Sequence, residues 1–416
     1  MSVSRLNPIW VLIPAMSLTF IGCSKNSNDD IGLKDPGSVK LTTISSHGEA
    51  LAAAQPILGI HATGSGAANS NDIPTTLPKL LNFKLPQGVK IDPKLQETVS
   101  AVKKVLDKPT QLAMRAKLNG LSQSIMAKTT TEDLCDEGSI ITESDGSQTS
   151  GSATITFKNC KTLTYNGYNV VNGTIKAKDS TNSDNTESSS EISIGNGDAN
   201  LEDNDLTYKN YDANDSLLQS ITVTGKATLK STTTDNSGKF SITINGRAEF
   251  VDSVNNTVDT ISIDQVSLDV NAGVDITNQS INSSNLNFVV DGAIEVVSDD
   301  KNTTTSPDER HYFGASNLSY SWNNDGTVSS ETLDGRFVVE NTPAQCGDGA
   351  YQLKTVTPMQ RYNYGALIAG EMNINDNTNI KVNTDGTISV TVNGTSTTYA
   401  DEAAMQTTLD GVCSLN

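Results

Sequence analysis

The feature that most constrains this chain is a repeated pattern of alternating apolar and polar residues with a glycine at its centre. Four full copies and one shorter copy occur, and their glycines are Gly173, Gly225, Gly246, Gly292 and Gly335. Alternation with a period of two predicts β-strands that bury one face. Asn, Thr or Asp precedes each glycine, and such a pair usually marks the turn of a hairpin.

A turn at these glycines would mismatch the two strands that it joins. A two-residue turn that includes Gly246 would place Ile244 opposite Arg247, so an apolar side chain would face a charge. A strand that runs straight through keeps its apolar residues and its glycine on one face, where glycine permits a sharp bend. The sequence therefore predicts a mainly β protein with a strongly curved antiparallel sheet, either open and barrel-like or a sandwich. A parallel β-helix is the main alternative, but the unequal spacing of the glycines lacks the fixed period of a solenoid.

Two amphipathic stripes precede the β region. Residues 91–128 contain helically spaced apolar residues twice, and Pro109 separates the two stripes. Asp92 can cap the first helix, and Pro93 suits its first turn. We expect this short helical pair to dock on the N-terminal side of the sheet, with a helix lying on a membrane surface as the alternative.

The C-terminal part predicts a small module of its own. A two-residue hairpin at Asn393-Gly394 matches Val392 with Thr395, so residues 371–400 are expected to form a β-meander, followed by a short helix near 401–409. The predicted organisation is a signal peptide over 1–22, a tether and linker over 23–90, a helical pair over 91–128, a curved antiparallel β domain over 129–341 and a disulfide-stapled β-meander module over 342–416.

The first residues have the order of a secretory signal, with Arg5, an apolar stretch and small residues at the end. The end, Phe20-Ile21-Gly22-Cys23, resembles the lipobox of bacterial lipoproteins. This resemblance implies that Cys23 carries a lipid anchor and that Ser24 directs the protein to the outer membrane, on either of its faces. Several acyl chains would hold the protein firmly to the membrane, which is therefore its expected partner.

The chain is strongly acidic, with 29 Lys and Arg against 48 Asp and Glu and a net charge of −19. Removal of residues 1–22 takes away only one charged residue, Arg5. Phosphate binding needs clustered Lys and Arg, so nucleic acid is not expected as a partner. This high negative charge favours a soluble surface and repulsion between copies of the protein.

Four cysteines follow Cys23 in the chain: Cys135, Cys160, Cys346 and Cys413. An even number in a secreted chain favours disulfides, and three connectivities are possible. Pairing of neighbours in the sequence is the simplest of them. A metal site is disfavoured, because no C-x₂-C pair occurs and the histidines lie far from the cysteines in sequence.

The stretch from Cys135-Asp-Glu-Gly to Phe157-Lys-Asn-Cys160, followed by Asn172-Gly173, resembles the start of poorly characterised bacterial envelope lipoproteins. This resemblance covers a short part of the chain and implies no activity.

No motif for catalysis stands out. The sequence lacks the G-x-S-x-G, H-E-x-x-H, P-loop and dinucleotide-binding glycine motifs. His311 is the one candidate catalytic imidazole, and we expect it to be a solvated surface residue. The loops 198–205 and 375–379 present alternating oxygen ligands, but they lack the glycine and the acid of an EF-hand and are expected to be polar loops.

The sequence thus predicts a non-catalytic, lipid-anchored envelope protein that acts as a binding or scaffold module. No cofactor, catalytic residue or metal ligand is expected. One alternative is a carrier that holds a lipid or another apolar ligand in a cavity between the curved sheet and the helices. A second is an enzyme that acts on polysaccharide with a pair of carboxylates.

Overall fold

A computed structural model provides the structure of this chain. It describes residues 33–54, 128–132, 135–146, 150–181, 187–197, 205–234, 237–275, 280–303, 308–325, 327–342, 344, 346–362 and 367–413.

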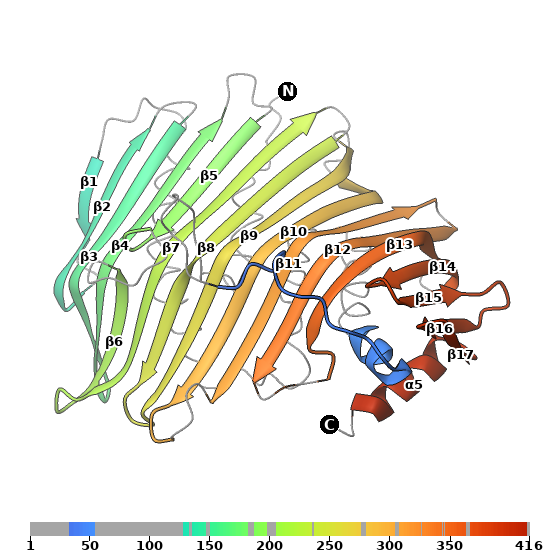
Figure 1. The fold of residues 1–416 in the computed structure, drawn as a ribbon. Helices are drawn as coiled ribbons and strands as arrows, with labels where there is room; N and C mark the ends of the chain where they lie inside the picture. Colours follow the sequence, from blue (N-terminus) through green and yellow to red (C-terminus); the bar gives the residue numbers. More distant parts are fainter. Residues whose placement is uncertain are drawn as a thin grey trace.

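In this described part of the chain, 17 antiparallel strands form one sheet. The first nine are β1 (Lys128–Glu132), β2 (Glu137–Gly146), β3 (Ser150–Thr164), β4 (Gly167–Thr181), β5 (Glu187–Ile194), β6 (Leu206–Asp212), β7 (Leu217–Thr234), β8 (Ser237–Asp252) and β9 (Thr257–Asp275). They are followed by β10 (Ser280–Asp300), β11 (Glu309–Asn324), β12 (Val328–Thr342), β13 (Gly349–Tyr362), β14 (Leu367–Ile374), β15 (Thr378–Val382), β16 (Ile388–Val392), β17 (Thr395–Tyr399) and the helix α5 (Glu402–Cys413). From β7 onward each strand pairs with the next one along the chain (Figure 1).

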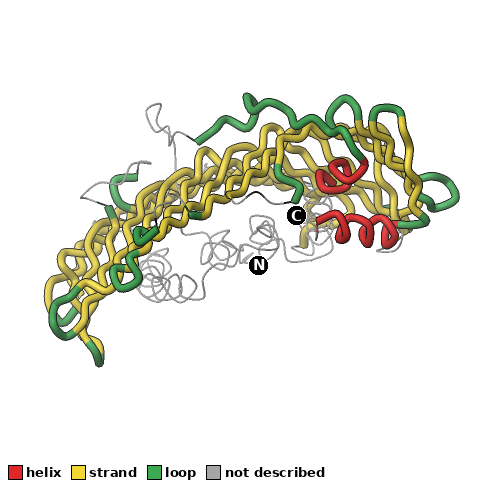
Figure 2. Tube along the Cα trace, turned by 60° about the horizontal axis from the view of Figure 1, so that its bottom comes forward, coloured by secondary structure: helices red, strands yellow, loops and turns green. Residues whose placement is uncertain are grey.

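The sheet is an arch (Figure 2), and its two faces differ in chemistry. The apolar face carries the buried side chains of alternate residues, such as Ile221, Tyr320 and Phe337. The opposite, polar face carries mostly Thr, Ser and charged residues. Because one face is buried, a shift of any strand by one residue would move its whole apolar set to the wrong side, so the alternation fixes the register. The predicted curved antiparallel sheet is confirmed.

Glycines bend the long strands where the sequence predicts bends. Gly246 lies in the middle of β8 and pairs with Gly225 of β7, so the strand runs straight through the Asn-Gly pair. Gly335 has a φ of 116°, a conformation that favours glycine. It faces a bulge in β11, where a Cβ at position 335 would lie 2.1 Å from the carbonyl oxygen of Asn317.

The residue before the glycine stabilises the bend as well. Asp291, which precedes Gly292, accepts a hydrogen bond of 2.5 Å from the backbone N–H of bulged Asn317. Asn172, which precedes Gly173, accepts one of 2.6 Å from the N–H of Asn159. These side chains satisfy backbone donors that the bulges release from the strand ladder.

Residues 33–46, which we call the strap, cross the polar face over β11, β12 and β13 (Figure 1). Leu33 and Val39 pack there on a small apolar cluster that includes Tyr312. Thr42 then exchanges two hydrogen bonds with Ala350, at the start of β13, where β14 does not yet pair. The strap thus fills the place of a missing neighbour of β13.

Beyond Thr42 the chain passes to the apolar face. Residues 47–54 are helical, and Ser46 and Glu49 form a reciprocal cap, with Glu49 N–H donating to Ser46 Oγ and Ser46 N–H donating to the Glu49 carboxylate. Leu51 of this helix is 1% exposed within the main core cluster. Part of the stretch that the sequence assigned to a tether and linker therefore packs against the sheet.

The C-terminal end of the sheet is closed by α5, which lies beside the helical residues 47–54 inside the arch (Figure 2). Asp401 caps α5 by accepting from Ala404 N–H at 2.8 Å, and Met405 and Leu409 are buried. Arg361 donates to both oxygens of Glu402 at 2.8 Å. The hairpin predicted at Asn393-Gly394 and the helix after it are confirmed.

Two disulfides join the cysteines that are neighbours in the sequence, Cys135–Cys160 and Cys346–Cys413. The second ties the end of α5 to the chain just before β13. Since β13 pairs with both β12 and β14, the sheet continues across the boundary predicted near residue 342. Cys23 and nearly all of the predicted helical pair, 91–127, lie outside the described residues. Within the ranges given above, no helix is both long and apolar enough to cross a membrane.

Candidate binding site

Cations gather on the polar face of β3 to β8, although the chain as a whole is acidic. Successive side chains of a strand point to opposite faces, and each of these cations is next in sequence to a residue of the apolar face. Their side chains therefore lie on the polar face. The cations are Lys158, Lys161, Lys176, Lys178, Lys209, Lys226, Lys230, Lys239 and Arg247. Lys226 is paired with Glu191 at 2.6 Å. On these strands the cations outnumber the acids of the same face, Glu187, Glu191 and Glu249, so this part of the polar face has a local positive charge that opposes the net charge of the chain.

The sheet is interrupted at the centre of this basic area. β5 and β6 occupy one strand position, since β4 pairs with β5 through residues 175–181 and with β6 through residues 167–172. β5 ends at Ile194, and the described chain resumes at Asp205, directly before β6. Gly173 makes room for this residue, because a Cβ at position 173 would lie 2.5 Å from the carbonyl oxygen of Asp205.

The edges of the interruption are fixed by polar contacts. Asp205 is 1% exposed and accepts a hydrogen bond of 3.2 Å from the N–H of Asn196. Thr224 of β7 donates to the side-chain oxygen of Asn196 at 2.6 Å. The buried carboxylate and these bonds hold Asn196, which follows β5, and Asp205, which precedes β6, against each other and against β7.

A half-open hollow of about 730 Å³ lies on the polar face at this interruption. The residues that line it are Thr156, Asn172, Gly173, Thr174, Lys176, Gly195, Asn196, Thr207, Lys209 and Thr222. Among the described residues, hydroxyl, amide and ammonium groups dominate the lining, and no acid, histidine or cysteine contributes to it. Within the described part of the chain, neither Lys176 nor Lys209 forms an ion pair.

The register orders these groups along the strands. Thr174 and Lys176 lie at the end of the hollow where β4 runs beside β5. At the other end β4 runs beside β6, where Thr207 pairs with Asn172 and Lys209 lies two residues further along β6. Lys209 pairs with Val170 of β4, which lies six positions before Lys176. At about 3.3 Å per residue, the Cα atoms of Lys176 and Lys209 are therefore roughly 20 Å apart. The hollow is thus elongated, with a cation toward each end and hydroxyl and amide groups between them.

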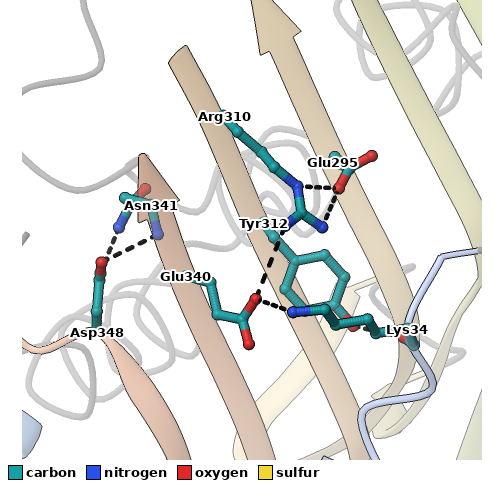
Figure 3. A network of polar contacts seen from close by, with 7 residues as sticks. All are labelled: Lys34, Glu295, Arg310, Tyr312, Glu340, Asn341 and Asp348. Atoms are coloured by element: carbon teal, nitrogen blue, oxygen red, sulfur yellow. Dashed lines mark hydrogen bonds and ion pairs between the residues drawn. The ribbon is translucent and has the colours of Figure 1, made fainter. Parts of the chain in front are cut away.

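A second polar cluster lies under the strap and is fully used for structure (Figure 3). Arg310 is paired with Glu295 at 2.5 Å, and Lys34 of the strap is paired with Glu340 at 2.5 Å. Tyr312 donates to the carbonyl oxygen of Lys34 at 2.6 Å. Burial, and then the nearby carboxylate of Glu340, raise the pKa of Tyr312 far above its ordinary value, so this hydroxyl stays a donor. The cluster fastens the strap to β10, β11 and β12.

His311 is buried, so its expected place on the solvated surface is wrong. It lies on the apolar face at the start of β11 and is 8% exposed. Its Nδ1 is bonded to the side-chain oxygen of Asn341 at 2.7 Å, and Asn341 in turn donates to Asp348 (Figure 3). Burial and the bond to the amide oxygen fix this imidazole against β12, and its Nε2 lies 3.7 Å from the carboxylate of Glu309.

The loops weighed as calcium sites behave as polar loops where the structure describes them. Asn375 and Asn377 donate to the carbonyl oxygens of Thr42 and Ile44 and so hold the strap. Residues 198–204 lie outside the described residues. Among the residues that are described, no three acid, His or Cys side chains come together as a metal site.

Sequence reasoning did not find Lys176, Lys209 or the threonines of the hollow. Their one visible signal is the choice of Lys and Thr at the polar positions of the alternating strands between β3 and β8. No family model matches this chain, and no curated protein matches it significantly.

Proposed function

We propose that this chain is a non-catalytic, lipid-anchored protein of the bacterial cell envelope and that it binds a hydrophilic ligand in the polar hollow. The observation that carries this proposal is the lining of the hollow. Its two lysines have no ion-pair partner among the described residues, and four threonines accompany them. A concave site with a few convergent polar groups is the usual form of a ligand site.

Binding suits this lining better than catalysis does. General acid–base chemistry needs a group that exchanges a proton near neutral pH, most often His, Asp or Glu. The hollow offers ammonium, hydroxyl and amide groups instead. These groups hold hydroxyls and anions in place, which is the task of a binding module.

The signal sequence supports an anchor at Cys23. Ten residues separate Cys23 from Leu33, where the strap begins to pack on the sheet. A chain of this length spans at most about 35 Å, so the anchor would keep the arch close to the bilayer. Substitution Cys23→Ser should abolish the mass of the acyl chains on the N-terminal peptide and move the protein out of the membrane fraction. Acylation at another residue, or an unchanged membrane fraction, would contradict the anchor.

An apolar carrier remains the second candidate, and a specific cluster favours it. On the apolar face of β2 to β8, residues such as Phe157, Ile221 and Phe250 are almost fully buried. Among the described residues, every member of this cluster comes from the sheet or from Cys135 beside it. The apolar chemistry of this cluster suits acyl chains, and a ligand would reach these side chains only if they became exposed.

Native mass spectrometry separates the two candidates. The processed chain is mixed in turn with tetragalacturonate, maltotetraose, tetraglutamate and oleate. We expect at least one hydrophilic probe to bind, and we expect Thr174→Trp, which fills the hollow, to abolish that binding. Thr228→Trp is the matched control, because Thr228 lies on the same face outside the hollow. Binding of oleate alone, unchanged in Thr174→Trp, would replace this proposal by the carrier.

A further inference from the structure

We propose that the ligand of the hollow is an acidic oligosaccharide, a short chain of sugar units that carries carboxylate or phosphate groups. This inference rests on the proposed binding function and adds the chemical class of the ligand. The shared chemistry is an anion joined to a hydroxyl-rich chain.

The anionic part follows from the two lysines. Lys176 and Lys209 line the hollow from β4 and β6, and Glu191, the nearest acid on the β5 side of the register, is already paired with Lys226. No carboxylate is among the described residues that line the hollow. An ammonium group that lacks a protein partner is free to form a charge-assisted hydrogen bond with an anion of the ligand.

The sugar part follows from the groups between the lysines. Thr156, Thr174, Thr207 and Thr222 come from four adjacent strand positions and line the same hollow. Each hydroxyl can donate one hydrogen bond and accept two, which matches the hydroxyls of a sugar. Asn172 and Asn196 add amide groups.

An acidic peptide fits this site less well. Peptide recognition at a sheet commonly uses a free strand edge, and specificity comes from pockets for side chains. The hollow lies within the sheet, between strands that are paired on both sides, and the described residues that line it include no aromatic or large aliphatic side chain. The size of the hollow, about 730 Å³, and the separation of its lysines suit an oligosaccharide laid along the strands rather than a single sugar.

Isothermal titration with three probes tests the class. We expect the processed chain to bind tetragalacturonate more tightly than maltotetraose, its neutral counterpart, and more tightly than tetraglutamate. Because a hydrogen bond to a charged group contributes about 1.5–3 kcal/mol, K176Q and K209Q should each weaken binding by roughly tenfold or more. Affinity should also fall with added salt, since the lysines are not deeply buried.

The double variant K178Q/K230Q is the matched control for K176Q/K209Q. It makes the same change in net charge on the same face, and neither residue lines the hollow. Retained binding in the control, with loss in K176Q/K209Q and equal melting temperatures, supports the inference.

Each other outcome overturns the inference in a recognisable way. Equal binding of maltotetraose and tetragalacturonate, still abolished by Thr174→Trp, would remove the anionic part and leave the binding function intact. Equal binding of tetraglutamate and tetragalacturonate would show that charge alone is recognised. Equal losses in the two double variants would show that the whole face, rather than the hollow, attracts the anion. Absence of binding of all three hydrophilic probes would overturn both proposals.

Discussion

Replacement of Gly335 by alanine adds one methyl group where β12 bends against the bulge of β11. The new Cβ would lie 2.1 Å from the carbonyl oxygen of Asn317 and 2.6 Å from the Cα of Leu318. The φ of 116° is also unfavourable for any residue with a Cβ. A left-handed conformation costs about 1–2 kcal/mol, and overpacking adds about 1–3 kcal/mol. We therefore expect Gly335→Ala to lower the free energy of unfolding by roughly 2–5 kcal/mol.

Gly386 provides a control that separates the two contributions. Its φ is 84°, but nothing lies within 4 Å of the Cβ that alanine would add. Gly386→Ala should therefore cost only the backbone contribution, about 1–2 kcal/mol.

Urea unfolding followed by the fluorescence of Trp322 measures both variants. Trp322 is 3% exposed on β11, close to the bend, and is the one tryptophan outside the predicted signal peptide. A shift of the midpoint without a change of slope reports stability. If the two variants lose the same free energy, close approach of the strands plays no part in the bend and our account of the curvature is wrong.

Three further predictions concern the strap and the disulfides. Tyr312→Phe removes the bond to the carbonyl oxygen of Lys34, so at about 1 kcal/mol per hydrogen bond trypsin should cleave the strap roughly fivefold faster; an unchanged cleavage rate would argue against this contact. Hydrogen bonds from Ser45 lower the pKa of Glu49 below 4.5 in the folded state, so its stabilising effect exists above pH 4.5 and is lost as the pH falls through the folded pKa. Glu49→Gln should therefore flatten the dependence of the urea midpoint on pH between about 3 and 5, and an equally steep dependence would count against the cap. The variant C346S/C413S opens a loop of 67 residues and should lose about 4.4 kcal/mol, more than the roughly 3.5 kcal/mol for C135S/C160S with its loop of 25, as compared by urea midpoints.

The bends could be predicted from the sequence because their cause is local. Around Gly246 and Gly335, the alternation shows which face is buried and which residue lacks a side chain. We then compare the residues that a turn would place opposite each other. Where apolar residues would face charges, a straight strand is predicted, and where the pairs match, a hairpin is predicted. The same test correctly identifies the true hairpin at Asn393-Gly394. In each case a few neighbouring residues carry all the information.

The hollow and the strap could not be predicted because their parts are distant in sequence. Lys176 and Lys209 line one site only because β5 and β6 share a strand position. No local pattern in the sequence shows that β4 pairs with β5 along one half and with β6 along the other. The strap is polar and rich in turn-forming residues, as a tether would be. Its order comes from partners such as Ala350, which lies 308 residues beyond Thr42.

This separation has a consequence for how the molecule can assemble. Thr42 and Lys34 are made early, but their partners Ala350 and Glu340 leave the ribosome near the end of synthesis. Contacts so far apart in sequence form slowly, because the loop entropy must be overcome first. The strap can pack only after β11 and β12 have been made, and its pairing with the start of β13 must follow the synthesis of Ala350. A chain that stalls before residue 350 would retain a long, bent sheet in which Thr42 has no backbone partner, because Ala350 is missing.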